Sequence, residues 1–222
     1  EIDLVGVELR AVDAREARSE ILAAKKNGAH VVLIDVYATP AAALADEVLL
    51  VRPGTDAFLA LAMDRLLQQE GRLDRAFLDR HTLGAAEFLA TLAPYTLEAA
   101  AQTTAVSKET IASVARGFAA ARSPVILFGA GMSRHGNGAM TIRCVTTLAA
   151  VTGAFAKPFG GIIGNASSSA AYRDNLITRP DFQQRRVRSI NMGQIGSALT
   201  ELNDPPILSL YVYSSNPASI AP

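Results

Sequence analysis

The segment from Val12 to Asp35 constrains the fold more than any other part of the chain. Asp13 can cap a helix, since apolar residues then recur at helical spacing up to two lysines and Gly28, which suit a helix C-terminus. His30–Ile34 follows as a continuous apolar run, typical of a strand buried on both faces, and the run ends on Asp35. A helix, a glycine, a buried strand and an acid in this order indicate a parallel sheet with crossover helices.

Similar strands recur along the chain, and each leads into a polar or glycine-rich loop. Further strands are predicted at 47–51, 123–128 and 206–213. Helices are predicted at 39–46, at 57–69 with Thr55 or Asp56 as the cap, in several short pieces over 74–121, at 137–152 and at 191–202. This alternation predicts an α/β fold with a doubly wound, mostly parallel sheet and helices on both faces.

The pattern also suggests how the chain divides. Residues 1–131 are predicted to form a dinucleotide-binding α/β domain, and residues 132–222 part of a second α/β domain. Beyond Gly153 glycine and serine dominate, so a long turn-rich connection is expected at about 153–190.

Composition excludes several classes of protein. Half of the 222 residues are hydrophobic, and 21 basic residues balance 21 acidic ones, which gives no electrostatic reason to expect a nucleic-acid partner. The single cysteine, Cys144, rules out a disulfide framework or a cysteine-rich metal cluster within this chain. The histidines are scattered outside any hydrolase motif, and no stretch has the pattern of a signal peptide or a membrane span.

The loops that follow the predicted strands are the best candidates for chemistry, because ligands of open α/β sheets bind beyond the carboxyl ends of the strands. Four such loops carry Asp35, the Arg52–Asp56 turn, Gly129–Gly131 and Ser214–Pro217. An acid at a strand end can accept hydrogen bonds from ribose hydroxyls, and a second acid can accept from the N–H groups of guanine. Glycines let the backbone approach a pyrophosphate closely. Each acid could equally serve only to cap a turn or a helix.

The order of these loops resembles that of the molybdopterin oxidoreductases of the dimethyl-sulfoxide-reductase type, which include formate dehydrogenases and nitrate reductases. The similarity covers almost the whole chain and is carried by Ala23–Asp35, by Thr39 with Ala45-Asp46, by Arg52–Asp56, by Asp74–Phe77 with Thr82–Gly84, by Gly129–Met132 with His135, Gly138, Arg143 and Leu148, by Thr152-Gly153 with Gly160-Gly161, and by Ser215–Pro217.

The resemblance implies a large enzyme with two pterin guanine dinucleotides on one molybdenum or tungsten, which performs two-electron redox chemistry on a small substrate. It implies the fold of the central domains of formate dehydrogenase and dimethyl-sulfoxide reductase. By resemblance, Arg134 and His135 would lie toward the metal and the substrate funnel, although no residue is assigned a catalytic role or a metal. The implied cofactor-binding residues are Asp35, Thr39, Pro53, Gly54, Asp56, Gly129, Gly131 and Met132 for one dinucleotide, and Ser215 and Asn216 for the other.

On this interpretation the chain is a central piece of the enzyme and is inactive alone, with no cofactor bound. Its partners would be the rest of the same polypeptide, namely a 4Fe-4S segment and a C-terminal pterin-binding barrel, together with electron-transfer subunits. The expected location is the cytoplasm. Two alternatives stay open. Ala120–Gly131 also resembles the strand that opens the middle domain of thiamine-diphosphate enzymes, and the chain could be a non-catalytic nucleotide-binding module.

Overall fold

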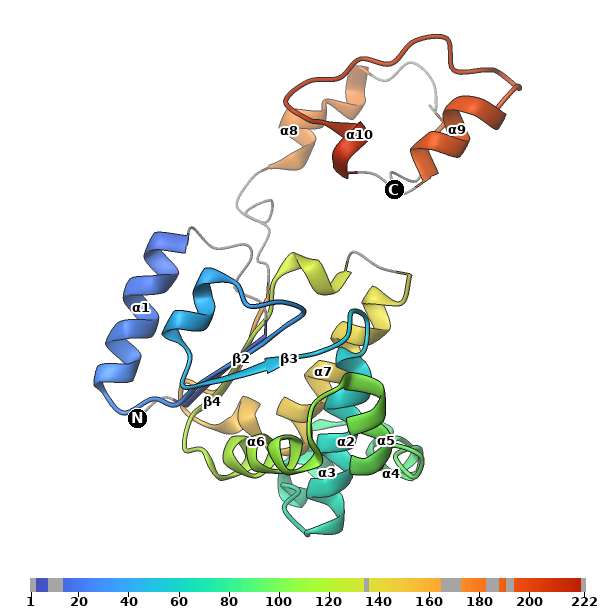
Figure 1. Cartoon of the computed structure of the whole chain (residues 1–222). Helices are drawn as coiled ribbons and strands as arrows, with labels where there is room; N and C mark the ends of the chain where they lie inside the picture. Colours follow the sequence, from blue (N-terminus) through green and yellow to red (C-terminus); the bar gives the residue numbers. More distant parts are fainter. Residues whose placement is uncertain are drawn as a thin grey trace. The chain divides into compact units, whose positions relative to one another are not determined.

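The computed structural model describes residues 3–7, 14–133, 136–164, 173–182, 188–190 and 194–220. They divide into two compact units, Glu1–Ala166 and Ser167–Pro222 (Figure 1). The first unit holds a parallel five-stranded sheet in the order β3-β2-β1-β4-β5. The chain is therefore an α/β protein, as its sequence predicts.

The elements of the first unit follow one another in a regular alternation. Its strands are β1 (Asp3–Val7), β2 (Val31–Asp35), β3 (Glu47–Leu50), β4 (Pro124–Leu127) and β5 (Gly161–Ile163). Its α-helices are α1 (Ala14–Lys26), α2 (Asp56–Gln69), α3 (Arg75–His81), α4 (Ala85–Ala90), α5 (Leu97–Thr104), α6 (Lys108–Ala120) and α7 (Gly138–Val151). Three 3-10 helices complete it: η1 (Pro40–Leu44), η2 (Ala130–Ser133) and η3 (Ala154–Ala156).

Helices cover both faces of the sheet, and β2 shows why. Its residues are all buried, and neighbouring side chains of a strand point to opposite faces. Val31 packs with Ile21 of α1 and Leu44 of η1, whereas Val32 belongs to the larger core formed with α2, α6 and α7. Figure 1 shows α1 on one side of the strands and these three helices on the other.

The join between α1 and β2 is made by the residues that the sequence pattern singled out. Gly28 ends the helix with a left-handed φ of 90°, which glycine adopts readily. Asp46 then fixes the helix to the strand, since its carboxylate accepts from the Val31 N–H at 2.8 Å and pairs with Lys25 at 2.8 Å. The hydrogen bond from Lys25, followed by that from Val31, lowers the pKa of Asp46.

The division of the first unit differs from the predicted boundary after Gly131. Helix α7 packs along α2, and β5 pairs in parallel with β4, so both elements belong to the first sheet and its cover. The physical reason is that β5 adds to an edge already formed by β4, through register pairs such as Ile126 with Ile162. The sequence analysis assigned this strand to the turn-rich connection and gave no strand at β1.

The second unit contains α8 (Asp174–Thr178), the 3-10 helix η5 (Pro180–Phe182), α9 (Ile195–Glu201) and α10 (Pro217–Ile220). The predicted strand at 206–213 is wrong. This segment forms no ladder, and only Pro206 makes an isolated bridge, to Asn203. A strand needs a neighbour to take its backbone hydrogen bonds, and none lies beside this segment in the described part of the chain.

Candidate functional site at the carboxyl edge of the sheet

Three of the four loops selected from the sequence lie at one edge of the first sheet. Strands β2, β3 and β4 are parallel and lie within one sheet, so their carboxyl ends share an edge. Asp35 is the last residue of β2, the Arg52–Asp56 turn follows β3, and Gly129–Met132 follows β4. The topology therefore brings together two acids and a glycine-rich loop that are about a hundred residues apart in sequence.

Asp35 is held in place by its own strand end. It is only 6% exposed, and its Oδ1 accepts from the backbone N–H of Val36 at 2.7 Å. Its carbonyl accepts from the Val51 N–H at 2.9 Å, which ties the end of β2 to the end of β3. A carboxylate has about four acceptor positions, so this single bond is compatible with further donors from a ligand. Thr39, half-buried at the start of η1, makes no side-chain capping bond.

The Arg52–Asp56 turn is braced from both ends. The Arg52 guanidinium donates to the carbonyls of Gln102 and Thr103 at the end of α5, and the Arg52 N–H donates to the Thr104 carbonyl at 3.0 Å. Thr55 occupies the N-cap position of α2 but makes no capping bond, because its hydroxyl donates to the Arg52 carbonyl at 2.7 Å. The predicted side-chain cap by Thr55 is thus replaced by a bond that closes the turn.

Within this turn, Pro53 and Gly54 are exposed. Gly54 adopts a left-handed φ of 76°, which a side chain would strain, and a Cβ there would meet nothing within 4 Å. The requirement for glycine is therefore conformational. The open space above Gly54 is consistent with a turn that a ligand can approach.

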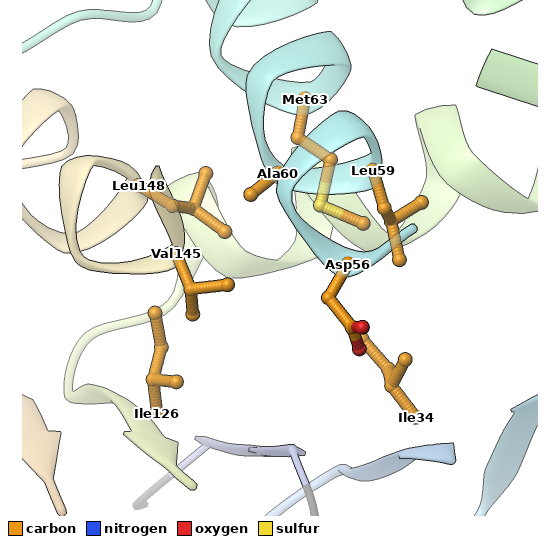
Figure 2. Close-up of a pocket in the computed structure, with 8 residues that line it drawn as sticks. All are labelled: Ile34, Asp56, Leu59, Ala60, Met63, Ile126, Val145 and Leu148. Atoms are coloured by element: carbon orange, nitrogen blue, oxygen red, sulfur yellow. The ribbon is translucent and has the colours of Figure 1, made fainter. Parts of the chain in front are cut away.

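Asp56 begins α2 and lies half-buried beside an apolar pocket. Figure 2 shows its carboxylate pointing from the first turn of the helix toward Ile34 and the sheet. The pocket is lined by Ile34, Asp56, Leu59, Ala60, Met63, Ile126, Val145 and Leu148. Asp56 is the one acid among them, so a hydrogen-bond acceptor lies at the margin of an apolar surface.

The loop after β4 turns into the 3-10 helix η2 and then into α7. Gly138 permits this turn, because a Cβ at that position would lie 2.7 Å from the Ser133 Cα and 2.8 Å from the Met132 carbonyl oxygen. Met132 was predicted to bind the cofactor, but its side chain is 4% exposed and packs in the core. Its contribution to a site would come from its backbone, whereas Gly131 is half-buried and accessible.

The remaining predicted residues fall elsewhere. Arg134 and His135 lie outside the described residues. Ser215 and Asn216 belong to the second unit and are exposed just before α10. Within the described part of the chain, His, Cys, Asp and Glu side chains do not gather in a group that could hold a metal ion.

The sequence analysis did not single out two positions that the structure makes distinctive. Gly138 was noted only as part of a motif, and Asp64 was absorbed into the predicted helix at 57–69. A signal for Asp64 existed: Ala60, Met63 and Leu67 lie one helical turn or less away and are all apolar, so the acid falls on the buried face.

The match to known proteins decides the family. The family model for the molybdopterin oxidoreductases matches residues 4–210. The chain belongs to the molybdopterin oxidoreductase family. Since the match spans the three strand-end loops, it replaces the thiamine-diphosphate alternative drawn from Ala120–Gly131.

Relatives and a solved structure agree with this family. The chain is 38% identical over 200 residues to probable oxidoreductase YoaE of Bacillus subtilis, covering 90% of this chain and 29% of that protein. It is 33% identical over 144 residues to formate dehydrogenase H of Escherichia coli, covering 65% of this chain and 20% of that protein. Acetylene hydratase from Pelobacter acetylenicus superimposes with a TM-score of 0.64 at 26% identity, over 68% of this chain and 21% of that structure.

The chain therefore spans less than a third of the length of these family members. Within the described part of the chain, no helix has the length and apolar character that a membrane crossing requires.

Proposed function

We propose that the carboxyl edge of the first sheet holds one molybdopterin guanine dinucleotide of a molybdenum or tungsten oxidoreductase. The observation that supports this most directly is the convergence of Asp35, the Arg52–Asp56 turn and Gly129–Gly131 at one edge. In this proposal Asp35 accepts from the ribose hydroxyls and Asp56 from the N–H groups of guanine. Thr39, Pro53 and Gly54 shape the same surface, and Met132 supports it from the core.

The residues present suit such a nucleotide. Guanine offers N–H donors on one edge of a flat ring, and Asp56 offers an acceptor beside the apolar surface of α2 and α7. Gly129 is buried and Gly131 is half-buried, and neither carries a side chain that would keep a pyrophosphate from the backbone N–H groups of this loop. We propose a doubly wound sheet of the formate dehydrogenase type as the frame of this site.

The whole protein would perform two-electron redox chemistry on a small substrate, with the metal of the cofactor as the redox centre. Ser215 and Asn216 of the second unit would serve the second dinucleotide. Arg134 and His135 would line the approach to the metal. The remainder of the polypeptide, with an iron–sulfur segment and a pterin-binding barrel, would be the main partner, and electron-transfer subunits would be further ones. The cytoplasm is our expected location.

Nucleotide titration tests the proposed site. We expect the 222-residue chain to bind GDP more tightly than ADP in isothermal titration calorimetry, because adenine lacks the paired N–H donors that Asp56 would accept. The variant Asp56→Ala should raise the Kd for GDP roughly 10- to 100-fold, as expected for loss of hydrogen bonds to a charged group.

The matched control is Asp79→Ala, which removes an exposed acid from α3. Helix α3 starts beside the C-terminus of α7, since the Asp74 N–H donates to the Val151 carbonyl at 2.8 Å, so it lies at the other end of α7 from the glycine loop. This variant should bind GDP like the unaltered chain. Equal losses in both variants, or equal affinity for GDP and ADP, would count against a guanine site at Asp56.

The chain alone should be inactive. We expect no turnover and no stoichiometric metal after purification, because this chain would supply only part of the protein surface that encloses the cofactor. Elemental analysis for molybdenum and tungsten measures this directly. A stoichiometric metal content would show that this chain holds the cofactor without further domains.

A non-catalytic nucleotide-binding module is the second candidate, and it predicts GDP binding without any oxidoreductase activity in the full polypeptide.

A further inference from the structure

Among the acids of the first unit whose burial the structure describes, Asp64 is the most deeply buried. It lies on α2 where this helix packs along α7, and its side chain is completely buried. Its Oδ1 has no hydrogen-bond partner among the described residues. An ionised carboxylate buried in this way loses its hydration without compensation, and the proposed nucleotide site makes no use of it.

The other oxygen of Asp64 contacts α7 through Thr147. The Thr147 hydroxyl oxygen lies 2.6 Å from Asp64 Oδ2 and 2.6 Å from the carbonyl oxygen of Cys144. Both neighbours are acceptors if Asp64 is ionised, yet a threonine hydroxyl carries one proton. One of the two short contacts would then have no proton of its own.

A proton on Asp64 removes this conflict. Asp64 Oδ2–H donates to Thr147 Oγ1, whose own proton goes to the Cys144 carbonyl, so that both short contacts are hydrogen bonds. The unpartnered Oδ1 becomes the carbonyl oxygen of a neutral acid, which costs much less to bury than a charged one. We propose that Asp64 is a neutral carboxylic acid that ties α2 to α7 through Thr147, and that loss of its proton loosens this helix pair.

The charged groups around Asp64 do not offer it a counter-ion within the described part of the chain. On α2 itself, Arg65 donates to the Leu92 carbonyl at 3.0 Å. Arg116 of α6 pairs with Glu70, and Glu98 of α5 lies 4.0 Å from Lys108 of α6.

On α7 the titratable neighbour is the Cys144 thiol. Its pKa is raised by burial and by the Asp64 carboxylate, against a lowering effect of Arg143. Burial raises the pKa of Asp64 to about 8, and the Thr147 hydrogen bond opposes the rise. The surroundings therefore favour the neutral form at neutral pH.

The contact between Asp64 and Thr147 joins two helices that each begin at a loop of the candidate site. Helix α2 begins at the Arg52–Asp56 turn, and α7 begins after the glycine loop that follows β4. Both loops are carried by the helix pair that Asp64 and Thr147 join. The hydrogen bond between Asp64 and Thr147 thus fixes the positions of the two loops relative to each other in a pH-dependent way, whether or not the loops bind a nucleotide.

The expected pH dependence follows from the two states of Asp64. In the unfolded chain an aspartate has an ordinary pKa near ~4, so between that value and about 8 only the folded chain holds the proton. The contribution of Asp64 to the stability must then fall as the pH rises through this window and level off above it. One proton corresponds to about a tenfold loss in the folding equilibrium constant per pH unit.

The experiment is urea unfolding of the 222-residue chain from about pH 5 to pH 9, compared with Asp64→Asn. The asparagine amide can still donate to Thr147 but does not titrate. We expect the ratio of the folding constants, unaltered chain over variant, to fall about tenfold per pH unit up to about pH 7.5 and to become constant above pH 8.5. Asp79→Asn, at an exposed acid, should show the pH profile of the unaltered chain.

A second measurement does not depend on whether the variant folds. Infrared spectroscopy of the unaltered chain at pH 6.5 should show the C=O band of one protonated carboxyl group, which disappears near pH 9 and, where Asp64→Asn folds, is absent from that variant. A ratio of folding constants that does not change with pH, or the absence of a protonated carboxyl band at pH 6.5, would show that Asp64 is ionised and would overturn the proposal.

Discussion

The two units of the chain differ sharply in how far their described apolar side chains are buried. In the first unit, strands β2 and β4 and helices α2, α6 and α7 enclose a continuous core with residues such as Leu67 and Phe118 at 0% and 1% exposure. In the second, Ala198 is the one buried hydrophobic residue among those described, while Leu208 and Tyr211 are 90% and 88% exposed.

This difference teaches which part of the chain carries its own stability. Burial of apolar surface is the main favourable contribution to folding. The first unit has a continuous buried core, whereas the described residues of the second unit do not form one. If the proposed larger enzyme exists, its remaining domains would be candidates to cover the exposed apolar segment at 206–213. The candidate site around Asp56 lies in the unit that needs no such cover.

The largest effect should come from a matched pair of leucines. Leu67→Ala should lower the free energy of unfolding by about 2–5 kcal/mol, because it leaves a cavity in the core of the first unit. Leu208→Ala removes the same atoms from an exposed position and should change it by less than about 0.5 kcal/mol. Urea unfolding measures both. Similar losses in the two variants would show that the second unit is packed as tightly as the first.

A smaller effect should come from a matched pair of glycines. Gly138→Ala places a Cβ against the backbone of Met132 and Ser133, which cannot move aside as a flexible side chain could. We expect a loss of about 1–3 kcal/mol and weaker GDP binding, since the glycine loop would shift.

Gly196→Ala is the counterpart in α9 of the second unit, where a Cβ meets nothing within 4 Å. It should leave the unfolding of the first unit unchanged. If Gly138→Ala were as harmless as Gly196→Ala, the close approach of α7 to η2 would not constrain the loop. The first unit would then not be more tightly packed than the second at this position.

The sequence predicted the central strands well because their signal is strong and local. β2 and β4 are continuous apolar runs, and α2 has a long apolar face after a turn of proline and glycine. A serine before a helical run is a common cap, and the Ser107 hydroxyl caps α6 by accepting from the Thr110 N–H at 3.1 Å. These features depend on residues within one element, so the sequence alone contains them.

The errors concern elements whose existence depends on a neighbour. β5 has three residues between glycines and is a strand only because β4 offers its edge. The segment at 206–213 has the apolar pattern of a strand but has no partner strand among the described residues, and it forms no strand there. Periodicity reports what a segment could bury and not what lies beside it.

The residues of the candidate site were predictable only where they depend on local sequence. The acids and glycines could be selected because strand-end loops are recognisable, and parallel topology brings three of the loops to one edge. The burial of Met132 and the turn-closing bond of Thr55 could not be predicted, because both depend on contacts made after η2 and the Arg52–Asp56 turn have formed.

The most direct test of the proposed site is to map GDP binding onto the isotopically labelled chain by NMR. The account predicts that added GDP shifts the amide signals of Asp35, the Arg52–Asp56 turn and Gly129–Gly131, and that Asp56→Ala requires a correspondingly higher GDP concentration for the same shifts. Signals at the amino ends of the same strands, such as His30 and Glu47, should stay unchanged. Shifts confined to that opposite edge, or to the second unit, would contradict a nucleotide site at the carboxyl edge of the sheet.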